Sequence, residues 1–413
     1  MGSFRFRLDT GVDPVSVAEW RERARRRLPE VALTYIEGGA DDLLTLSENT
    51  NAFRKWRLRM RSLTGVSAPD LSTTIAGTRV ALPFGLAPIG ASGLAHWTGD
   101  IAASRAAESC GTRAILSTAA SYRLEEVAEA TEQNHWFQLY PIGARERIAK
   151  LIERARAAGY TALFVTVDCT TLGNREGERR WNMTMPWTVT PARALHMLRH
   201  WRWVWQALHH KRIAAIHFLD EAKEAAEEAR RATLTDSLND AANSKERLFS
   251  LMQGDIGWDD VAWMREQWGG PFYIKGILDP DDAAYAVDTI GADGVVVSNH
   301  GGRQLDRCLA TIDALPAIAA RIGDRAEVYL DGGIRRGTDI ITALCLGADA
   351  VFIGRAYLYG LAANGQEGVA SVIRLLKEEL ERDMMLMGCG SVSELGRSWL
   401  LPAAQGETVL NAK

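Results

Sequence analysis

Short apolar runs alternate with longer stretches rich in Ala, Glu and Arg from residue 82 onward. This rhythm is typical of βα units, in which buried parallel strands are separated by amphipathic helices. Eight runs have the composition of strands, at 83–87, 113–116, 136–139, 162–167, 272–274, 295–297, 327–330 and 350–353. Eight parallel strands close a barrel, so the pattern predicts an α/β fold built as a single (β/α)8 TIM barrel.

The residues outside these repeats predict the rest of the organisation. Asp13 as N-cap and Pro14 at the first helical position predict a helix over 13–28, and a second helix should end at Gly38 and Gly39. We expect N-terminal helices and a barrel-bottom cap in 1–81, the barrel in 82–390, an insertion after the fourth strand in 186–250, and a C-terminal tail in 391–413.

Polar residues and glycines accompany the ends of the predicted strands. In a (β/α)8 barrel the carboxyl ends of all strands meet at one rim, so these residues should form a single site. In chain order they are Pro88 and Gly90; Ser117; Gln138 and Tyr140; Thr166, Asp168 and Arg175; Lys275; His300 and Arg303; Asp331, Gly332, Gly333 and Arg335; and Gly354 and Arg355.

The stretch 294–306, G-V-V-V-S-N-H-G-G-R-Q-L-D, carries the most specific chemistry. A buried strand ends there, and the next positions hold an imidazole, two glycines and a guanidinium. His300 and Arg303 gain nothing in packing at that place, and glycine allows a close approach of the backbone to a ligand. An acid-base group therefore sits beside a planar anion clamp, which favours a functional role over a packing role.

Other strand ends suggest a phosphate site and charged partners. The runs at 331–337 and 354–355 offer backbone N–H groups, a helix N-terminus and guanidinium groups, although each could be only a tight βα turn. Lys275 ends an apolar strand, where a buried ammonium needs an anion. Asp168 could orient an imidazole or cap a helix. Tyr35 is either a core aromatic or a phenol delivered into a site.

Composition excludes several classes of protein. The net charge is −4 and 47% of the residues are hydrophobic, which gives no indication of nucleic-acid binding. Five scattered cysteines argue against a disulfide framework and a zinc site, and for a reducing compartment, and we expect no metal. The first residues lack an apolar run, so we expect no secretory signal, and no window of 18 apolar residues predicts a transmembrane helix.

These motifs carry a resemblance to a known family. In this order and spacing, F-Q-L-Y, T-V-D, I-K-G, S-N-H-G-G-R-Q-L-D and D-G-G-I-R-R-G-T-D resemble the FMN-dependent L-2-hydroxy acid dehydrogenases and oxidases, which include glycolate oxidase, lactate dehydrogenase and mandelate dehydrogenase. The resemblance covers about residues 13–397. It implies that FMN oxidises a 2-hydroxy acid to the 2-oxo acid, with the redox chemistry supplied by the cofactor.

The resemblance also implies a role for each matching residue. His300 would be the base, paired with Asp168, and Arg175 and Arg303 would bind the substrate carboxylate, with Tyr35 and Tyr140 nearby. Lys275 would lie beside the flavin N1 and C2 carbonyl. The flavin would be lined by Pro88, Ile89, Gly90, Ser117, Gln138, Thr166 and Ser298, and the ribityl phosphate would be held by Asp331, Gly332, Gly333, Arg335, Gly354 and Arg355.

Three departures from the glycolate oxidase pattern bear on substrate and acceptor. Ala119 stands where that enzyme has Trp, which implies room for a larger substrate side chain. Gly90 in place of Ala and Ile89 in place of Thr make membrane-associated (S)-mandelate dehydrogenase the nearer pattern. We therefore expect a dehydrogenase that passes electrons to a quinone or other carrier, with an oxidase that produces H2O2 from O2 as the alternative. The family suggests a homotetramer.

Two other functions of an FMN-binding barrel agree less well with the residues of this chain. An FMN barrel with isomerase or nucleotide dehydrogenase activity does not need two guanidinium groups for one carboxylate, so Arg175 and Arg303 disfavour it. A flavin-bearing sensor without turnover is disfavoured by the intact set of His300, Asp168 and Lys275.

The insertion predicts contact with a membrane. Residues 186–219 contain four Trp, five His and five Lys or Arg but no Asp or Glu. On a helical wheel one face collects Ala194, Leu198, Trp201, Trp205 and Leu208, as in helices that lie in a membrane interface. We expect 186–220 to bind an anionic membrane surface, which would place a cytoplasmic protein on the inner face of the cell membrane. An intersubunit or lid helix and a mobile loop over the active site are the alternatives. Residues 221–245 should form an exposed helix and linker.

Overall fold

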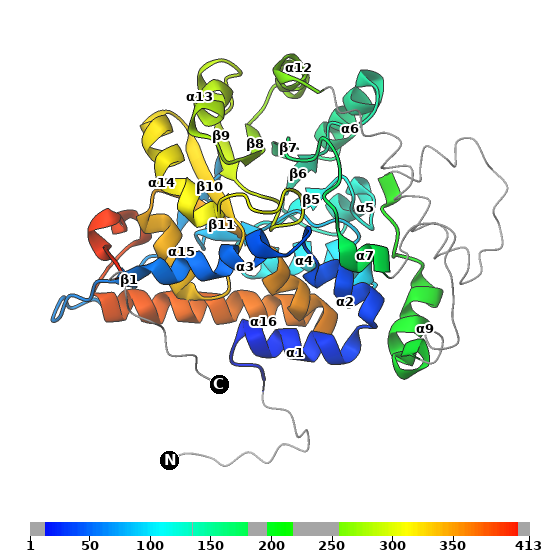
Figure 1. The fold of residues 1–413 in the computed structure, drawn as a ribbon, viewed down its shortest axis with the longest axis horizontal. Helices are drawn as coiled ribbons and strands as arrows, with labels where there is room; N and C mark the ends of the chain where they lie inside the picture. The colour runs from blue at the N-terminus through cyan, green and yellow to red at the C-terminus, as the bar shows by residue number, and fades with distance from the viewer. Residues whose placement is uncertain (1–12, 134, 181–195, 218–255, 404–413) are drawn as a thin grey trace, which may run out of the picture.

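The computed structural model describes residues 13–133, 135–180, 196–217 and 256–403 (Figure 1). Its centre is a sheet of eight parallel strands in the order β4-β11-β10-β9-β8-β7-β6-β5. The two outer strands meet through a parallel bridge between Leu86 and Ala114, and the Leu86 amide donates to the Arg113 carbonyl at 2.9 Å. The sheet is therefore closed, and the predicted (β/α)8 barrel is confirmed.

The barrel strands agree with the predicted runs to within a few residues at their ends. They are β4 (Phe84–Leu86), β5 (Ile115–Ser117), β6 (Trp136–Leu139), β7 (Ala162–Thr166), β8 (Phe272–Ile277), β9 (Gly294–Val297), β10 (Glu327–Asp331) and β11 (Ala350–Ile353). Strand β8 is longer than predicted because it continues through a register shift between Lys275 and Ile277. Gly276 makes this possible, since its φ of +106° lies in the region that favours glycine.

Helices surround the barrel, and the long α16 crosses beneath it in Figure 1. The α-helices that follow barrel strands are α4 (Gly99–Ser109), α5 (Leu124–Glu129), α6 (Arg145–Ala157), α7 (Glu176–Arg180), α9 (Trp201–His210), α12 (Trp258–Trp268), α13 (Pro280–Asp288), α14 (Thr311–Ile322), α15 (Gly337–Cys345) and α16 (Arg355–Met387). Helix α16 packs against α4 and α15. Non-helical backbone angles at Asn364 and Gly365 kink it.

The N-terminal helices differ from the prediction at their start. Helix α1 spans Val17–Arg27, so the predicted start at Asp13 is wrong. The actual N-cap is Ser16, whose hydroxyl accepts from the Glu19 amide at 3.2 Å and so satisfies an otherwise unpaired donor of the first turn. Helix α2 spans Glu30–Glu37 and ends at Gly38, as predicted, and α3 spans Leu44–Asn51.

Short strands and 3-10 turns complete the fold around the barrel. The hairpin of β2 (Thr73–Ile75) and β3 (Thr78–Val80) reaches the amino end of the strands, where the Ala76 amide donates to the Tyr329 hydroxyl at 2.7 Å. Strand β1 (Trp56–Leu58) pairs with β12 (Leu400–Pro402) near the chain end. The 3-10 turns are η1 (Ala52–Lys55), η2 (Ser92–Leu94), η3 (Gly323–Arg325), η4 (Val392–Glu394) and η5 (Arg397–Trp399).

The described part of the insertion has the predicted apolar face on its outside. Trp203 of α9 is buried, and its indole N–H donates to the Leu94 carbonyl at 2.8 Å. Trp201 and Trp205, on the predicted apolar face, are 61% and 55% exposed. The predicted apolar face therefore points away from the protein, because Trp203 and Ala207 make the inward contact. The predicted helix and linker over 221–245 lie outside the described residues.

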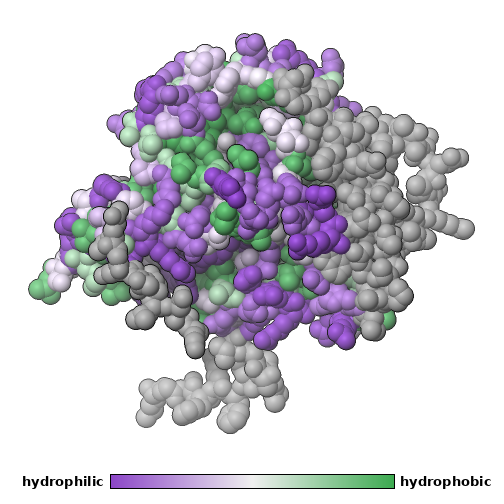
Figure 2. Space-filling view, in the orientation of Figure 1, coloured by the Kyte–Doolittle hydropathy of each residue, from purple (hydrophilic) through white to green (hydrophobic). Residues whose placement is uncertain are grey.

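Polar side chains cover most of the face drawn in Figure 2, and apolar residues gather in its upper centre, over the region of β8 and β9 in Figure 1. Among the described residues, none of the helices combines the length and the apolar character that crossing a bilayer requires.

Candidate active site

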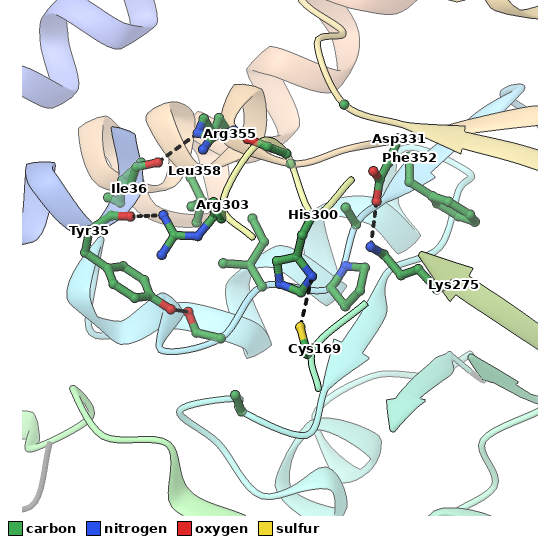
Figure 3. A pocket seen from close by; sticks show the side chains of 18 of the residues that line it. Tyr35, Ile36, Cys169, Lys275, His300, Arg303, Asp331, Phe352, Arg355 and Leu358 are labelled. Carbon is green, nitrogen blue, oxygen red and sulfur yellow. Dashed lines mark hydrogen bonds and ion pairs between the residues drawn. The ribbon is translucent and has the colours of Figure 1, made fainter. Parts of the chain in front are cut away.

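A cavity opens at the carboxyl ends of the barrel strands and is lined by residues from distant parts of the chain (Figure 3). Helix α2 supplies one wall, and the loops after β4, β7, β9, β10 and β11 supply most of the rest. Of the predicted site residues, the cavity is lined by Tyr35, Pro88, Ile89, Gly90, Tyr140, Arg175, Lys275, His300, Arg303, Asp331, Gly332, Gly333, Arg335, Gly354 and Arg355. Strand ends separated by hundreds of residues thus meet at one rim, as the barrel topology requires.

His300 stands just beyond the end of β9 in a strained backbone conformation. Its φ of +57° lies in the left-handed region, which costs a non-glycine residue roughly 1–3 kcal/mol. The Ser298 hydroxyl accepts from the His300 amide at 3.1 Å and helps to hold this turn. Such strain is typical of residues whose position serves a site rather than the stability of the fold.

The imidazole of His300 is oriented by a carboxylate on one side and a phenol on the other. Its Nδ1 lies 2.9 Å from Asp168 Oδ1, and its Nε2 lies 3.2 Å from the Tyr140 hydroxyl oxygen. The Asp168 carboxylate accepts a hydrogen bond from Nδ1–H, so the lone pair of a neutral ring is on Nε2. Burial lowers the pKa of His300, against the opposing effect of Asp168. A neutral imidazole can accept a proton at Nε2.

Two arginines that line the same cavity lie around a buried carboxylate. Arg303 donates to Glu178 at 2.9 Å and to the Tyr35 carbonyl at 2.6 Å. Arg175 lies 3.6 Å from the same Glu178 oxygen and donates to Gln304 at 3.0 Å. Glu178 balances one of the two positive charges, so the pair has one net positive charge with which to bind an anion.

Tyr35 reaches the cavity from α2, which favours the second of its two predicted roles, a phenol delivered into a site. Its hydroxyl donates to the Gly90 carbonyl at 2.9 Å, and the Arg303 guanidinium lies 4.9 Å from its ring centre. A Cβ added to Gly90 would lie 2.8 Å from the Cβ of Ala119. Gly90 and Ala119 therefore share one wall of the cavity, and the small size of each leaves space beside Tyr35.

Lys275 is a buried cation with two polar partners. Its Nζ lies 2.9 Å from Asp331 and donates to the Ser298 hydroxyl at 2.8 Å. Burial acts to lower the pKa of Lys275, but the carboxylates of Asp331 and Asp168 outweigh it and raise the pKa above its ordinary value. The ammonium group therefore stays charged and presents a fixed positive charge to the cavity (Figure 3).

The turns after β10 and β11 have the features of an anion site. Gly332 and Gly333 have φ values of +97° and +82°, and a Cβ on Gly333 would lie 1.8 Å from a backbone oxygen of Asn49. Arg355 begins α16 and donates to the carbonyls of Ile36, Gly38 and Gly301. Because these acceptors are uncharged, burial and the nearby Arg303 lower the pKa of Arg355 to about 9. A phosphate here would stabilise the guanidinium.

Four predicted flavin residues stand behind the cavity instead of lining it. The Ser117 hydroxyl donates to the Gln138 side chain at 2.9 Å, and the Gln138 amide donates to the Thr166 hydroxyl at 2.8 Å. Ser298 is bonded to Lys275, as described above. All four side chains are buried, and they form polar contacts across neighbouring strand ends β5, β6, β7 and β9.

Sequence reasoning missed two residues of the site. Glu178 holds the two arginines, and Cys169 lies 3.4 Å from His300 Nδ1. Glu178 lies three residues after Arg175, a spacing that brings side chains together on a helix and could have indicated the pairing. Cys169 directly follows Asp168, so its place next to a candidate catalytic residue was the available signal.

Comparison with known proteins identifies the family. The sequence model described as FMN-dependent dehydrogenase matches residues 24–402. The chain belongs to the FMN-dependent dehydrogenase family. FMN is therefore its cofactor, and the site fits that group: the Arg355 guanidinium hydrogen-bonds only uncharged carbonyls, and Asp331 Oδ1 is buried without a hydrogen-bond partner among the described residues.

Relatives in this FMN-dependent family match nearly the whole chain. L-lactate oxidase from Nostoc is 41% identical over 94% of this chain and 98% of its own. L-lactate dehydrogenase from Caulobacter vibrioides is 40% identical over 93% of this chain and 97% of its own. The crystal structure of the monotopic membrane protein (S)-mandelate dehydrogenase has a TM-score of 0.86 with 33% identity, covering 95% of this chain and 100% of that chain.

Proposed function

We propose that this FMN-dependent enzyme oxidises an L-2-hydroxy acid to the 2-oxo acid and passes the electrons to a membrane quinone or other carrier. One observation carries the proposal: His300, which is paired with Asp168, lines the same cavity as Arg303 and Arg175. A base opposite two carboxylate-binding groups matches a substrate that has a carboxylate next to the carbon that reacts. The names of the lactate and mandelate relatives support the same class of substrate.

Each group in the cavity has a defined task in this reaction. Arg303 and Arg175 hold the substrate carboxylate and thereby place its hydroxyl-bearing carbon next to His300. Nε2 of His300 accepts one proton, from either the carbon or the hydroxyl, and Asp168 stabilises the resulting imidazolium. Tyr140 donates a hydrogen bond near the same atoms, because burial raises the pKa of its phenol well above the ordinary value.

The bound FMN supplies the two-electron acceptor for the reaction. Arg335, Arg355 and the backbone of Gly332 and Gly333 would hold its phosphate. Lys275 would stand beside the ring system, where its fixed charge favours negative charge that develops during oxidation of the substrate. We infer that Pro88, Ile89 and Gly90 border the ring, while Ser117, Gln138, Thr166 and Ser298 support it from the strand ends.

Anaerobic flavin bleaching tests the activity and narrows the substrate. Glycolate, lactate, mandelate and a long-chain 2-hydroxy acid are each added to the enzyme without oxygen. We expect the L enantiomer of at least one acid larger than glycolate to bleach the flavin, because Ala119 and Gly90 leave room beside the reacting carbon. A flavin that no 2-hydroxy acid bleaches would contradict the proposal.

The reduced enzyme from the same experiment distinguishes a dehydrogenase from an oxidase. We expect a soluble quinone to restore the flavin spectrum quickly and air to restore it slowly with little peroxide. Fast reoxidation by air with one peroxide formed per flavin would instead identify a 2-hydroxy acid oxidase, the alternative function. The match of Gly90 and Ile89 to the mandelate dehydrogenase pattern supports the dehydrogenase.

We further propose that the enzyme docks peripherally on an anionic membrane, on the inner face of the cell membrane. Exposed Trp201 and Trp205 of α9 provide apolar groups suited to the lipid interface. Helix α9 is held near the end of α1, because His200 Nδ1 lies 3.2 Å from the Arg27 carbonyl. The exposed basic residues at the end of α1, just before α9 and on α9, which are Arg25, Arg26, Arg27, Arg199 and Arg202, would face anionic headgroups.

Liposome sedimentation tests this docking surface. A Trp201→Ser/Trp205→Ser variant should bind anionic vesicles at least about tenfold more weakly, since each indole removed takes away roughly 150–250 Å² of contact area. Leu305→Ser is the matched control, because Leu305 is 71% exposed but lies outside this surface. Deletion of 190–215 should have the larger effect. Equal sedimentation of the deletion variant and the full chain would show that the insertion is not the membrane contact.

The remaining predictions of organisation stay predictions. We propose a homotetramer on the strength of the family resemblance, and domain boundaries at 81, 186–250 and 390 on the strength of the sequence pattern. The mass of the purified enzyme in solution would test the first.

A further inference from the structure

Cys169 lies against the proposed base and its carboxylate partner. Its Sγ is 3.4 Å from His300 Nδ1 and 3.3 Å from Asp168 Oδ1, and those two atoms are 2.9 Å apart. Among the described residues, Asp168, Cys169 and His300 are the one group of at least three His, Cys or acidic side chains whose ligand atoms all lie within 4.8 Å of one another. Asp168 Oδ2 is buried and has no hydrogen-bond partner among the described residues.

These distances are close to those of a metal site. Tetrahedral Zn²⁺ with bonds of about 2.3 Å to sulfur and about 2.0–2.2 Å to nitrogen and oxygen separates sulfur from a nitrogen or oxygen ligand by roughly 3.5–3.7 Å, and nitrogen from oxygen by roughly 3.3–3.5 Å. The two distances from Cys169 Sγ, 3.4 and 3.3 Å, are a few tenths of an ångström shorter, so the sulfur would move slightly outward around an ion. The pair of His300 Nδ1 and Asp168 Oδ1 is closer because a proton joins it, and it would widen slightly once an ion replaced that proton. Thiolate and imidazole favour Zn²⁺ over Mg²⁺ and Ca²⁺.

An ion can reach the cluster from two directions. Cys169 and Ile142 line the catalytic cavity, and both also line a second cavity bounded by Thr170 and Trp258. His300 itself opens to the catalytic cavity (Figure 3), from which water can complete the coordination. Lys275 and Arg175 also face this region and oppose a cation, and burial together with Asp168 raises the pKa of the Cys169 thiol well above its ordinary value. Zn²⁺ must therefore displace the thiol proton, after which the Asp168 carboxylate and the Cys169 thiolate together balance its charge.

We propose that Asp168, Cys169 and His300 form an inhibitory binding site for Zn²⁺, an inference that rests on the role proposed for His300. Binding of Zn²⁺ releases the thiol proton of Cys169 to the buffer and forms the sulfur–zinc bond. The proton on His300 Nδ1 moves to Nε2 as the metal takes its place. Nothing is oxidised or reduced. Nε2 then carries a proton and has no lone pair with which to accept one from the substrate.

Direct metal binding and flavin reduction together test this site. The FMN-loaded enzyme is dialysed against Zn²⁺, and the bound metal is counted; the rate of anaerobic bleaching by the best 2-hydroxy acid is then measured with and without the metal. We expect Cys169→Ala and Cys169→Ser to bind one tight equivalent fewer per chain and to lose at least about a hundredfold in affinity, since even outer-shell changes cost up to that much. Cys308→Ala, at another partly exposed cysteine, should bind as the wild type does.

Each outcome has a definite meaning. The bleaching rate of each variant with Zn²⁺ is compared with the rate of the same variant without metal. A Cys169 substitution that changes the metal-free rate therefore does not affect the comparison. FMN that stays bound shows that the variant is folded. Unchanged zinc stoichiometry and affinity in both Cys169 variants would overturn the inference. So would zinc bound through Cys169 that leaves bleaching by the substrate unaffected. A wild-type enzyme that no hydroxy acid bleaches would contradict the proposed function instead, and the dialysis result would still decide whether the metal binds.

Discussion

Flavin reduction by the substrate should slow by about 10²–10⁴-fold in His300→Ala, the usual contribution of a positioned general base. The alanine variant removes the only proton acceptor that the proposal assigns to the reaction, while Arg303 and Arg175 still bind the carboxylate. FMN should stay bound, because its proposed contacts lie at the turns after β10 and β11 and at Lys275. Stopped-flow absorbance of the flavin under anaerobic conditions measures the effect.

Two comparisons separate a chemical role of His300 from a structural one. The substrate affinity of the alanine variant should stay within a few fold of wild type, since the anion clamp is untouched. Asp168→Asn should retain the imidazole but lose its charged partner, and so should fall between the wild type and His300→Ala. A His300→Ala variant that is reduced at the wild-type rate would remove His300 from the mechanism.

Arg303→Met should lower kcat/KM severely, with the larger part of the change in KM. The substrate carboxylate loses charge-assisted hydrogen bonds worth roughly 1.5–3 kcal/mol, which corresponds to about 10–150-fold. The variant also removes the Arg303 partner of Glu178, whose side chain is 2% exposed. A buried carboxylate with fewer partners is costly, so thermal stability should fall as well.

Matched variants show whether the loss depends on the position and shape of the guanidinium. Arg307→Met removes a cation four residues away that is 77% exposed and lies 3.8 Å from Asp42, so it should change KM little. Arg303→Lys keeps the charge but not the planar fork, and should recover only part of the activity. Substrate saturation curves that coincide for wild type and Arg303→Met would contradict the assignment of Arg303 to the carboxylate.

The buried carboxylate of Glu178 explains how Arg303 and Arg175 can lie side by side in the cavity. Burial is the main cause that lowers the pKa of Arg303, and repulsion from Arg175 is the second. Glu178 acts in the opposite direction. The Arg303 guanidinium is further fixed by the carbonyls of Tyr35 and Gly38. Such a clamp is already ordered before substrate binds, which reduces the entropy lost on binding.

The barrel and most of the proposed site could be predicted from the order of residues along the chain. Each apolar run is followed by polar residues or glycine, and a repeated βα unit places the carboxyl end of every strand at the same rim. The convergence of His300, Asp168, Lys275 and Arg355 therefore follows from topology alone. The motif around His300 was specific enough to indicate the cofactor and the class of substrate.

Other features required the folded chain, because they depend on which neighbours a side chain meets. Helical periodicity grouped Trp201 with Trp205 but could not tell which face of α9 packs inward; the Leu94 carbonyl, more than 100 residues earlier, provides the partner that buries Trp203. Spacing along the chain likewise did not reveal that Cys169 meets His300, since the contact forms only where β7 and β9 end at one rim. Periodicity determines local structure and the common direction of the strands, whereas packing determines which side chains touch.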